Sequence, residues 1–314
     1  MSSEDHASTL AQLKDDFTRL PLKDLGKRAY KKIGADQVTT MSGAFAYAWT
    51  FSIPPLILLT VLFAALLNEV TNVPVVENMQ DAIKKHAPAD TQEMLLRMVD
   101  NAVAKVGGNT ASVGVIVTAI LALWAASSAI GVLITGFNRA YDVEEDRSFL
   151  KKKGVQLGLT LMLVLFVNAV VALLVFGQQI GNWLADWIGV GSAFNTFWSF
   201  ARWPLGILGI MLTLAVLYWA GPNVDLPFRW VSAGTVVATV LWLALVAGFG
   251  LYMSVSNPGS AYGVVGAVIV LLVFLNLTGI IFFLGAEINA ILYSAVARHR
   301  VARWHEPGMA VANQ

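Results

Sequence analysis

The stretch YGVVGAVIVLLVFLNLTGIIFFLGAEINA, residues 262–290, decides the fold class, because Glu287 is its only charged side chain. A transmembrane helix needs about 20 mostly apolar residues to cross about 30 Å of hydrocarbon at a rise of about 1.5 Å per residue. The stretch therefore predicts a helix that spans a membrane. If the span begins near Gly263, Glu287 lies about 36 Å along it, so we expect the carboxylate at the membrane boundary and not at the midplane.

The rest of the chain repeats this pattern. Of its 314 residues, 57% are hydrophobic and 13% are charged, whereas soluble domains contain about 25% charged residues. We predict an all-α, polytopic membrane protein with six transmembrane helices, near residues 43–67, 112–138, 154–185, 203–221, 231–254 and 263–293. The chain has no cysteine, which excludes disulfides, thiolate metal ligands and cysteine nucleophiles.

Lysine and arginine are distributed unequally between the segments that connect these spans. Sixteen fall in the N-terminal segment, the loops 139–153 and 222–230 and the C-terminal tail, and five fall on the opposite side. Positively charged loops stay in the cytoplasm, so this bias predicts that both termini are cytoplasmic. An even number of spans also requires both termini on one side, which agrees with the charge distribution.

Two segments outside the spans have helical periodicity. In residues 1–42, apolar residues recur at helical spacing between basic ones, which predicts amphipathic helices that lie either on the anionic inner leaflet or against the cytoplasmic loops. The insert 68–111 contains two further apolar patterns separated by Pro88, which predict an external helical hairpin. We therefore divide the chain into a cytoplasmic amphipathic segment 1–42, a transmembrane domain 43–293 that carries the insert, and a basic cytoplasmic tail 294–314.

The chain offers few signatures of enzymatic chemistry. Its four histidines lie in the tails or in the external insert, and none forms a metal-ligand pair. It has no glycine-rich phosphate loop and no nucleophile elbow. The acids of residues 142–146 could hold a divalent ion, but the basic residues beside them favour a self-neutralising turn. We therefore expect no enzymatic activity, no catalytic residue, no cofactor and no bound metal.

The first span contains a proline pair in FSIPPLILL, residues 51–59. Pro54 and Pro55 each lack a backbone N–H, so they either kink the helix or break it. A broken helix inside a membrane needs protein or a water-filled cavity to satisfy its freed carbonyls. The region from Tyr47 to Pro55 is therefore a candidate cavity wall, with a static kink as the alternative.

Small residues also recur within the predicted spans. Their short side chains let two helix backbones approach closely in a membrane. The pairs that predict such contacts are Ala125 with Ala129, Gly154 with Gly158, and Gly263 with Gly266.

Four stretches together resemble the YihY/BrkB family of bacterial inner-membrane proteins, once labelled ribonuclease BN. They are GAFAYAWTFSIPPLILL (43–59), LWAASSAIGVLITGFNRAYDV (123–143), LYWAGPNVDLPFRWVSAG (217–234) and the stretch quoted first. The resemblance covers about residues 40–293 and implies a six-helix integral membrane fold. Family members have been linked to serum resistance and, in one branch, to export of a lipopolysaccharide-type lipid. One departure is Phe274, Leu275 and Asn276, where the family often has Trp-Leu-Tyr.

The resemblance also implies candidate site residues. Polar positions that the family shares fall on Tyr47, Ser52, Pro54, Trp124, Asn138, Arg139, Tyr141, Pro222, Asn223, Arg229, Tyr252, Tyr262, Gly285, Glu287 and Asn289. The candidate inner-side polar cluster among them is Asn138, Arg139, Arg229, Glu287 and Asn289. The candidate cavity wall is Tyr47, Ser52, Pro54, Pro55 and Trp124. A buried charge needs a partner, so we expect Glu287 within salt-bridge or one-water reach of Arg139 or Arg229, as a structural clamp or an inner gate.

These observations favour a transporter or a flippase-like protein that moves a lipid or another amphipathic envelope substrate in the bacterial inner membrane. The alternative is a scaffold for envelope assembly that transports nothing, which the amphipathic N-terminus and the external hairpin favour. Expected partners are membrane lipids, including a lipid substrate, and no nucleic acid, and a homo-oligomer is compatible with the sequence. A cavity would favour transport, and a tightly packed bundle would favour the scaffold.

Overall fold

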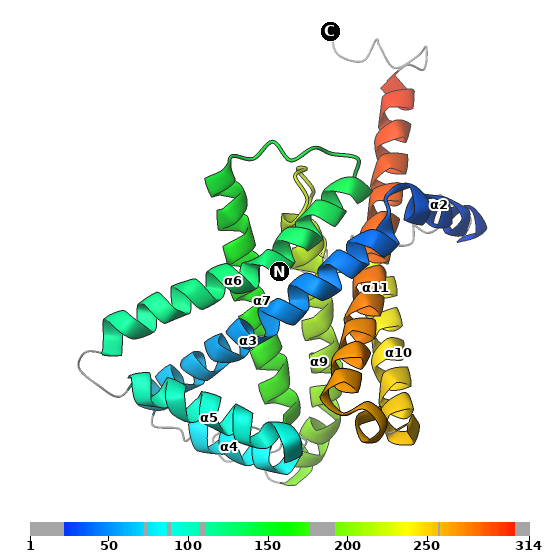
Figure 1. The fold of residues 1–314 in the computed structure, drawn as a ribbon. Helices are drawn as coiled ribbons and strands as arrows, with labels where there is room; N and C mark the ends of the chain where they lie inside the picture. Colours follow the sequence, from blue (N-terminus) through cyan, green and yellow to red (C-terminus); the bar gives the residue numbers. More distant parts are fainter. Residues whose placement is uncertain are drawn as a thin grey trace. The chain divides into compact units, whose positions relative to one another are not determined.

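The computed structural model describes residues 22–71, 75–86, 89–106, 111–175, 192–256 and 258–304 (Figure 1). Within these ranges all regular structure is α-helical, as predicted, and no strand occurs. The helices are α2 (Leu22–Ala35), α3 (Val38–Thr71), α4 (Val75–His86), α5 (Ala89–Val106), α6 (Ala111–Ala140), α7 (Phe149–Val175), α9 (Ser192–Ala220), α10 (Ala233–Ser256) and α11 (Pro258–Trp304).

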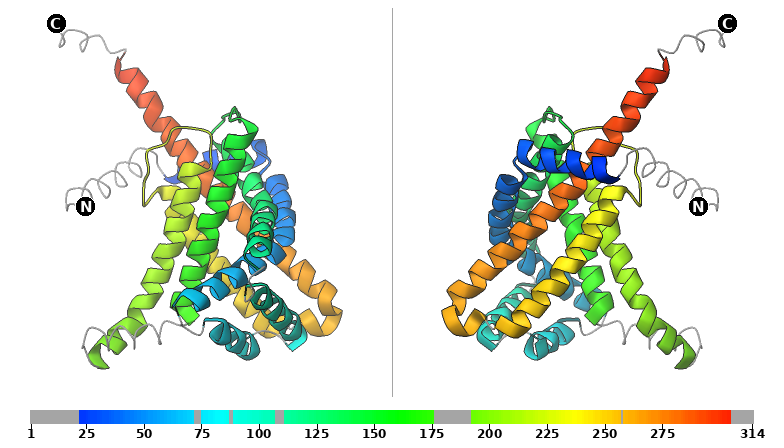
Figure 2. Two further views of the ribbon diagram at one scale, coloured as in Figure 1. Left: turned by 90° about the vertical axis from the view of Figure 1, so that its left-hand side faces the viewer. Right: turned by 90° about the vertical axis from the view of Figure 1, so that its right-hand side faces the viewer.

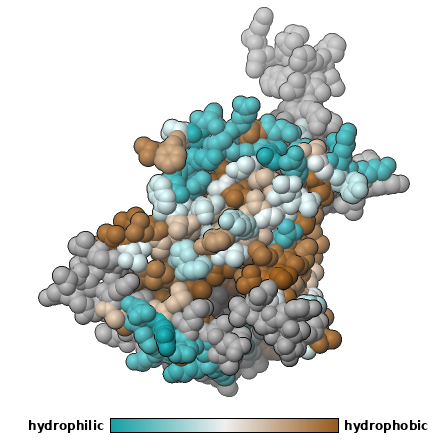
Figure 3. Space-filling model, in the orientation of Figure 1, coloured by the Kyte–Doolittle hydropathy of each residue, from teal (hydrophilic) through white to brown (hydrophobic). Residues whose placement is uncertain are grey.

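Six of these helices are long and apolar enough to cross a membrane, which confirms the predicted number. Their apolar spans are Val38–Ala64, Ile116–Ala140, Phe149–Val170, Phe197–Ala220, Ala233–Val255 and Val268–Ser294. Many large apolar side chains on these spans are exposed, among them Phe200, Trp203 and Val240. The face drawn in Figure 3 accordingly carries wide brown apolar areas, as expected where helices contact lipid.

Two helices differ from the prediction in ways that matter for function. The helix α3 is continuous from Val38 to Thr71 and contains Pro54 and Pro55, so the prolines do not break it and the broken-helix interpretation is wrong. The helix α7 begins at Phe149, before the predicted start of the span near residue 154. Lys151, Lys152 and Lys153 therefore lie in its first turns and not in the loop before it. The part of the third predicted span beyond residue 175 lies outside the described residues, as does the amphipathic pattern of residues 10–20.

The chain forms two compact units. The first unit comprises residues 1–47, 132–149 and 200–314, and the second comprises residues 48–131 and 150–199. Along the chain, both α3 and α6 pass from one unit into the other. Each unit is described by itself below.

In the first unit, α11 packs against both α10 and α2 (Figure 2). The contact between α10 and α11 depends on Gly234 and Gly285, because a Cβ atom on Gly234 would meet the carbonyl oxygen of Gly285. Gly279 of α11 lies close to α3, where a Cβ atom would be 2.8 Å from the ring of Phe45. These glycines let backbones approach closely. By contrast, no described atom lies within 4 Å of a Cβ atom built on Gly154 or Gly158, so that predicted close contact is absent.

In the second unit, α4 and α5 pack against each other as the predicted helical hairpin. Val76 of α4 and Val99 of α5 form a buried cluster with Val61 and Leu62 of α3. A cavity of about 370 Å³ adjoins this cluster and is lined almost entirely by apolar side chains. The hairpin is therefore fixed to the end of α3 by burial of its apolar face.

Candidate functional site

A pocket of about 480 Å³ lies in the first unit, among the ends of α6 and α9, the beginning of α10 and an inner stretch of α11. One cationic and one anionic side chain, Arg229 and Asp225, line it together with hydroxyl and amide groups and several aromatic rings. Its lining residues are Tyr141, Ala215, Tyr218, Trp219, Asp225, Leu226, Pro227, Arg229, Ser232, Ala233, Asn289, Leu292 and Tyr293. A concave site of this size with a few convergent polar groups is typical of ligand-binding pockets.

The beginning of α10 forms one wall of the pocket. Ser232 caps this helix, because its hydroxyl oxygen accepts a hydrogen bond from the backbone N–H of Thr235 at 3.1 Å. Asn289 of α11 caps it a second time, since its Oδ1 accepts a hydrogen bond from the N–H of Gly234 at 2.8 Å. The first backbone donors of a helix otherwise have no partner. These two contacts hold the α10 N-terminus against α11 and place Ser232 and Asn289 at the pocket.

Aromatic side chains form another part of the pocket lining. The rings of Tyr141 and Tyr293 lie edge to face with centroids 6.3 Å apart. Burial raises the pKa of the Tyr141 hydroxyl, and the neighbouring Tyr293 and Glu287 raise it further, whereas the charge of Arg229 lowers it. Tyr141 therefore stays protonated at neutral pH and offers the pocket a neutral hydrogen-bond donor.

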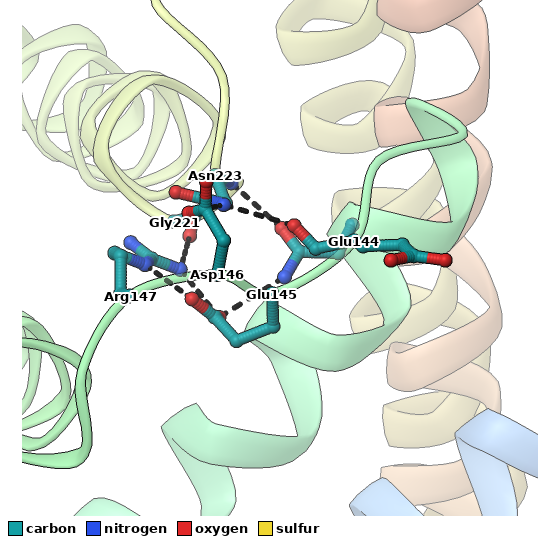
Figure 4. Close-up of polar contacts among 7 residues, drawn as sticks. Glu144, Glu145, Asp146, Arg147, Gly221 and Asn223 are labelled. Carbon is teal, nitrogen blue, oxygen red and sulfur yellow. Dashed lines mark hydrogen bonds and ion pairs between the residues drawn. The ribbon is translucent and has the colours of Figure 1, made fainter.

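A second network joins the loop 141–148 to the loop 221–232 (Figure 4). Asn138 accepts a hydrogen bond from the backbone N–H of Asn223 at 2.7 Å and donates one to Glu145 at 3.1 Å. Arg147 donates to both carboxylate oxygens of Glu145, at 2.6 and 2.7 Å, and to the carbonyl oxygen of Gly221 at 3.1 Å. We name this network, Asn138, Glu145, Arg147, Gly221 and Asn223, the loop clamp. The Glu145–Arg147 pair agrees with the predicted self-neutralising turn.

Glu287 contacts a cation that we did not predict. The ammonium group of Lys32 in α2 lies 3.9 Å from its carboxylate. The physical reason is that α2 packs directly on α11, so the last turn of α2 brings Lys32 to the buried face of α11. The expected reach of Glu287 to Arg139 or Arg229, directly or through one water, stays a prediction.

Lys32 contacts two further carboxylates besides Glu287. Its ammonium group lies 3.2 Å from Asp36 and 3.0 Å from Asp142, and it also donates a hydrogen bond to the carbonyl oxygen of Ala140 at 3.0 Å. Burial by itself lowers the pKa of Lys32, but the hydrogen bond to Asp142 and the charges of Glu287 and Asp36 outweigh it and raise the pKa above its ordinary value. Lys32 therefore stays charged at neutral pH. We name Lys32, Asp36, Asp142 and Glu287 the carboxylate cluster.

The five residues of the predicted inner-side polar cluster thus fall into separate places in the first unit. Arg229 and Asn289 line the pocket, Asn138 belongs to the loop clamp, and Glu287 belongs to the carboxylate cluster. Arg139 is exposed and is not among the pocket residues. Sequence reasoning missed Lys32 and Asp36, whose only local signal is a spacing of four residues that puts both on one side of a helical turn.

The five residues named as the predicted cavity wall line neither of the two pockets, although Trp49 and Ile53 of the predicted region 47–55 do line the apolar cavity. Tyr47 is 66% exposed in the first unit, and Pro54 is exposed in the second. Ser52 is fully buried and donates to the carbonyl oxygens of Ala48, at 2.8 Å, and of Ala126, at 3.2 Å. These contacts make Ser52 a link between helices of the second unit.

The other two predicted wall residues also lie elsewhere. Trp124 is 48% exposed and lies under the ammonium group of Lys153, 4.1 Å from the ring centroid. Pro55 is half-buried, and the apolar cavity is lined by its neighbours Trp49, Ile53 and Leu56. The helix α3 turns these three residues, spaced by three and four positions, toward the cavity, and it turns the prolines away.

The described residues contain no candidate metal site. In the part of the chain that the structure describes, no three His, Cys, Asp or Glu side chains are grouped so that they could hold a metal ion. Three carboxylates do meet in the carboxylate cluster, but the cation among them is the ammonium group of Lys32.

Six apolar helices and a polar, aromatic pocket among helix ends define a polytopic α-helical membrane protein. Residues 29–308 match the family described as Virulence factor BrkB, so the chain belongs to this family. The resemblance seen in the sequence is thereby confirmed.

Two relatives are similar over most of their length. The chain is 30% identical over 268 residues to a protein of Bacillus subtilis (strain 168) described as ribonuclease-like, YfkH, covering 85% of this chain and 94% of the relative. It is 24% identical over 270 residues to a UPF0761 membrane protein of Tolumonas auensis, covering 84% of this chain and 83% of the relative. No solved structure matches the chain.

Proposed function

We propose that this protein moves an amphipathic lipid between the leaflets of the bacterial inner membrane, and that the pocket binds the polar headgroup. The observation that carries the proposal is the pocket itself, in which Arg229, Asn289 and Ser232 face the same space as the rings of Tyr141 and Tyr293. Arginine and amide groups recognise phosphate and sugar oxygens, and tyrosine and tryptophan rings favour the boundary between apolar and wet surroundings.

The size of the pocket supports a headgroup in preference to a whole lipid. A volume of about 480 Å³ suits a phosphate with a sugar or a small amine, but not two acyl chains. The acyl chains of such a substrate would stay in the bilayer, against the exposed apolar faces of the spans. A pocket of this kind also favours transport over the scaffold, which needs no binding site.

The proposal includes an orientation and a location. Both termini are cytoplasmic, because the loops on their side carry most of the lysine and arginine residues. The pocket then opens at the cytoplasmic ends of the spans, where a newly made lipid is available. Similarity to a UPF0761 membrane protein supports the membrane location. We propose transport without enzymatic chemistry, a metal or a cofactor, and with no nucleic acid as partner.

We expect Arg229→Gln to slow lipid transfer at least about tenfold, because a hydrogen bond to a charged group contributes about 1.5–3 kcal/mol. The measurement uses the purified full chain in liposomes of phosphatidylethanolamine and phosphatidylglycerol. Headgroup-labelled fluorescent analogues of both lipids are placed in one leaflet, and a membrane-impermeant quencher follows their transfer to the other.

Arg139→Gln is the matched control, since it removes the same charge from an exposed position outside the pocket. It should transfer the labelled lipids at the rate of the unaltered protein. Transfer no faster than in protein-free liposomes, for either probe and with the unaltered protein, would contradict the proposal. Equal slowing by both variants would show that net charge, and not the pocket, sets the rate.

A further inference from the structure

The carboxylate cluster brings two largely buried carboxylates, Asp36 and Glu287, and the exposed carboxylate of Asp142 to a single ammonium group. Glu287 is 1% exposed, and its Oε2 atom accepts no hydrogen bond from the described residues. The Oδ2 atom of Asp36 is likewise buried, and its contact is the ion pair with Lys32 at 3.2 Å. Among the residues that the structure describes, Lys32 is the cation that lies within 4 Å of all three acids, at distances of 3.0 to 3.9 Å. A buried acceptor without a donor is unfavourable unless something supplies the missing hydrogen.

Two of the acids meet at the same ammonium group. The Nζ atom of Lys32 lies 3.2 Å from Asp36 Oδ2 and 3.9 Å from Glu287 Oε2, so the two carboxyl groups are neighbours. Two ionised carboxylates have acceptors only and repel, whereas one proton between them supplies a donor and removes the repulsion. Water screens the charge of Glu287 poorly, because Glu287 is buried and its neighbour Ile288 belongs to a buried apolar cluster with Ala29 and Ile291.

The backbone at this place is also unusual. Gln37, next to Asp36, has a φ angle of 53°, and Asp142 has a φ angle of 54°, so two residues other than glycine adopt the left-handed conformation at the cluster. This conformation is uncommon for such residues and costs about 1 kcal/mol or more. The ends of α2 and α6 are thus held in strained turns that bring Asp36 and Asp142 onto Lys32.

The cluster is adjacent to the pocket. Asp142 follows the pocket residue Tyr141, and Glu287 lies two residues before the pocket residue Asn289. The charge of Glu287 acts on the hydroxyl group of Tyr141. A change of charge in the cluster therefore changes the electrostatic environment of Tyr141, which lines the pocket.

We propose that Asp36 and Glu287 form a proton-binding site that takes up one proton from water and shares it between the two carboxyl groups. Lys32 competes with this proton, because it balances the same negative charge. When the proton is bound, Lys32 is held more weakly to Glu287, and when it leaves, the ion pair draws α2 toward α11. The last step rests on the proposed function: the site couples lipid movement to the proton gradient.

Other charged or titratable groups lie around the pair. Lys32 and Asp142 face it, Tyr141 and Tyr293 lie on the pocket side, and Arg229 acts on Tyr141 from the loop before α10. Of these, Lys32 opposes protonation of the pair and Asp142 favours it. Replacing Lys32 by a neutral residue should therefore increase proton occupancy at every pH.

The test is labelling of the purified full chain in lipid nanodiscs with dicyclohexylcarbodiimide, which reacts with protonated carboxyl groups in apolar surroundings. Peptide mass spectrometry locates the adduct. We expect an adduct on Glu287 or Asp36 that decreases as the pH rises, and that persists to higher pH in Lys32→Met. Glu144→Gln, which removes an exposed acid of the adjoining loop, should leave the adduct unchanged.

Infrared difference spectra between acidic and alkaline buffer give a second readout that needs no reagent access. A protonated-carboxyl band that disappears in both Glu287→Gln and Asp36→Asn supports the site. A spectrum without that band in the folded protein, or an adduct that Lys32→Met does not shift, overturns it. Both measurements are independent of transport, so a chain that binds the proton but moves no lipid would refute the proposed function alone. If both proposals hold, Glu287→Gln abolishes the dependence of lipid transfer on an imposed pH gradient.

Discussion

Gly234→Ala is expected to destabilise the protein by about 3 kcal/mol, at the upper end of the cost of overpacking, because the new methyl group has no space. A Cβ atom at this position would overlap the carbonyl oxygen of Gly285 and lie 2.6 Å from the Cγ atom of Asn289. The first of these is a backbone atom, so a change of rotamer cannot relieve the overlap. The helices α10 and α11 would have to separate, and the cap that Asn289 provides would be lost with them.

The measurement is the thermal unfolding of the purified protein in detergent, with size-exclusion chromatography as a check of folding. Gly248→Ala, on the same helix, is the matched control, because no described atom lies within 4 Å of its Cβ position. Alanine favours a helix by about 1 kcal/mol over glycine, so the control should be unchanged or slightly more stable. Equal stability of the two variants would contradict the close contact of α10 and α11.

The number of spans could be predicted from the sequence because length and apolarity decide it. A run such as 262–290 admits one structure in a membrane, since every backbone group must be satisfied within the helix. The helical hairpin of α4 and α5 was predictable for a similar reason, because its apolar residues repeat at helical spacing on both sides of Pro88. In these cases a local pattern determines the outcome.

The partner of Glu287 could not be predicted in the same way. Periodicity shows which face of a helix is apolar, but it does not say which neighbouring helix covers that face. Arg139 and Arg229 were natural candidates because both lie at span ends, yet α2 packs on α11 and places Lys32 there. The glycine contacts of α10 and α11 were not predicted either, although Gly234 and Ala238 are four residues apart, a spacing that is typical of close helix contacts in membranes.

The predicted cavity wall shows a third limit. Proline indicates a missing hydrogen bond, and it does not indicate on which side of the helix a cavity lies. In α3 the helical turn places Trp49, Ile53 and Leu56 at the apolar cavity, and Pro54 is exposed. A hydrogen-bond network between two loops likewise leaves no pattern in either loop's own sequence. The loop clamp was therefore indicated only by its cluster of charges.

That loop clamp leads to the second large expected effect. Arg147→Met should lower the free energy of unfolding by about 3 kcal/mol, because breaking a buried ion pair from one side costs about 3–5 kcal/mol. Arg147 is 7% exposed and Glu145 18% exposed, so water screens their pair poorly. The substitution removes two hydrogen bonds to Glu145 and the one to the carbonyl oxygen of Gly221.

A double-mutant cycle separates the ion pair from simple packing. Glu145→Gln keeps an oxygen that can accept the hydrogen bond from Asn138, so Glu145→Gln with Arg147→Met should recover about half of the stability lost in Arg147→Met alone. Glu144→Gln, at an exposed position of the same loop, should change stability by less than about 0.5 kcal/mol. Thermal unfolding in detergent measures the four proteins of the cycle and the Glu144→Gln control. A double variant no more stable than Arg147→Met would mean that the buried charge of Glu145 is not what makes the substitution costly. In that case the bond from Arg147 to Gly221 would be the contact that holds the loop 221–232, and with it Arg229, in place at the pocket.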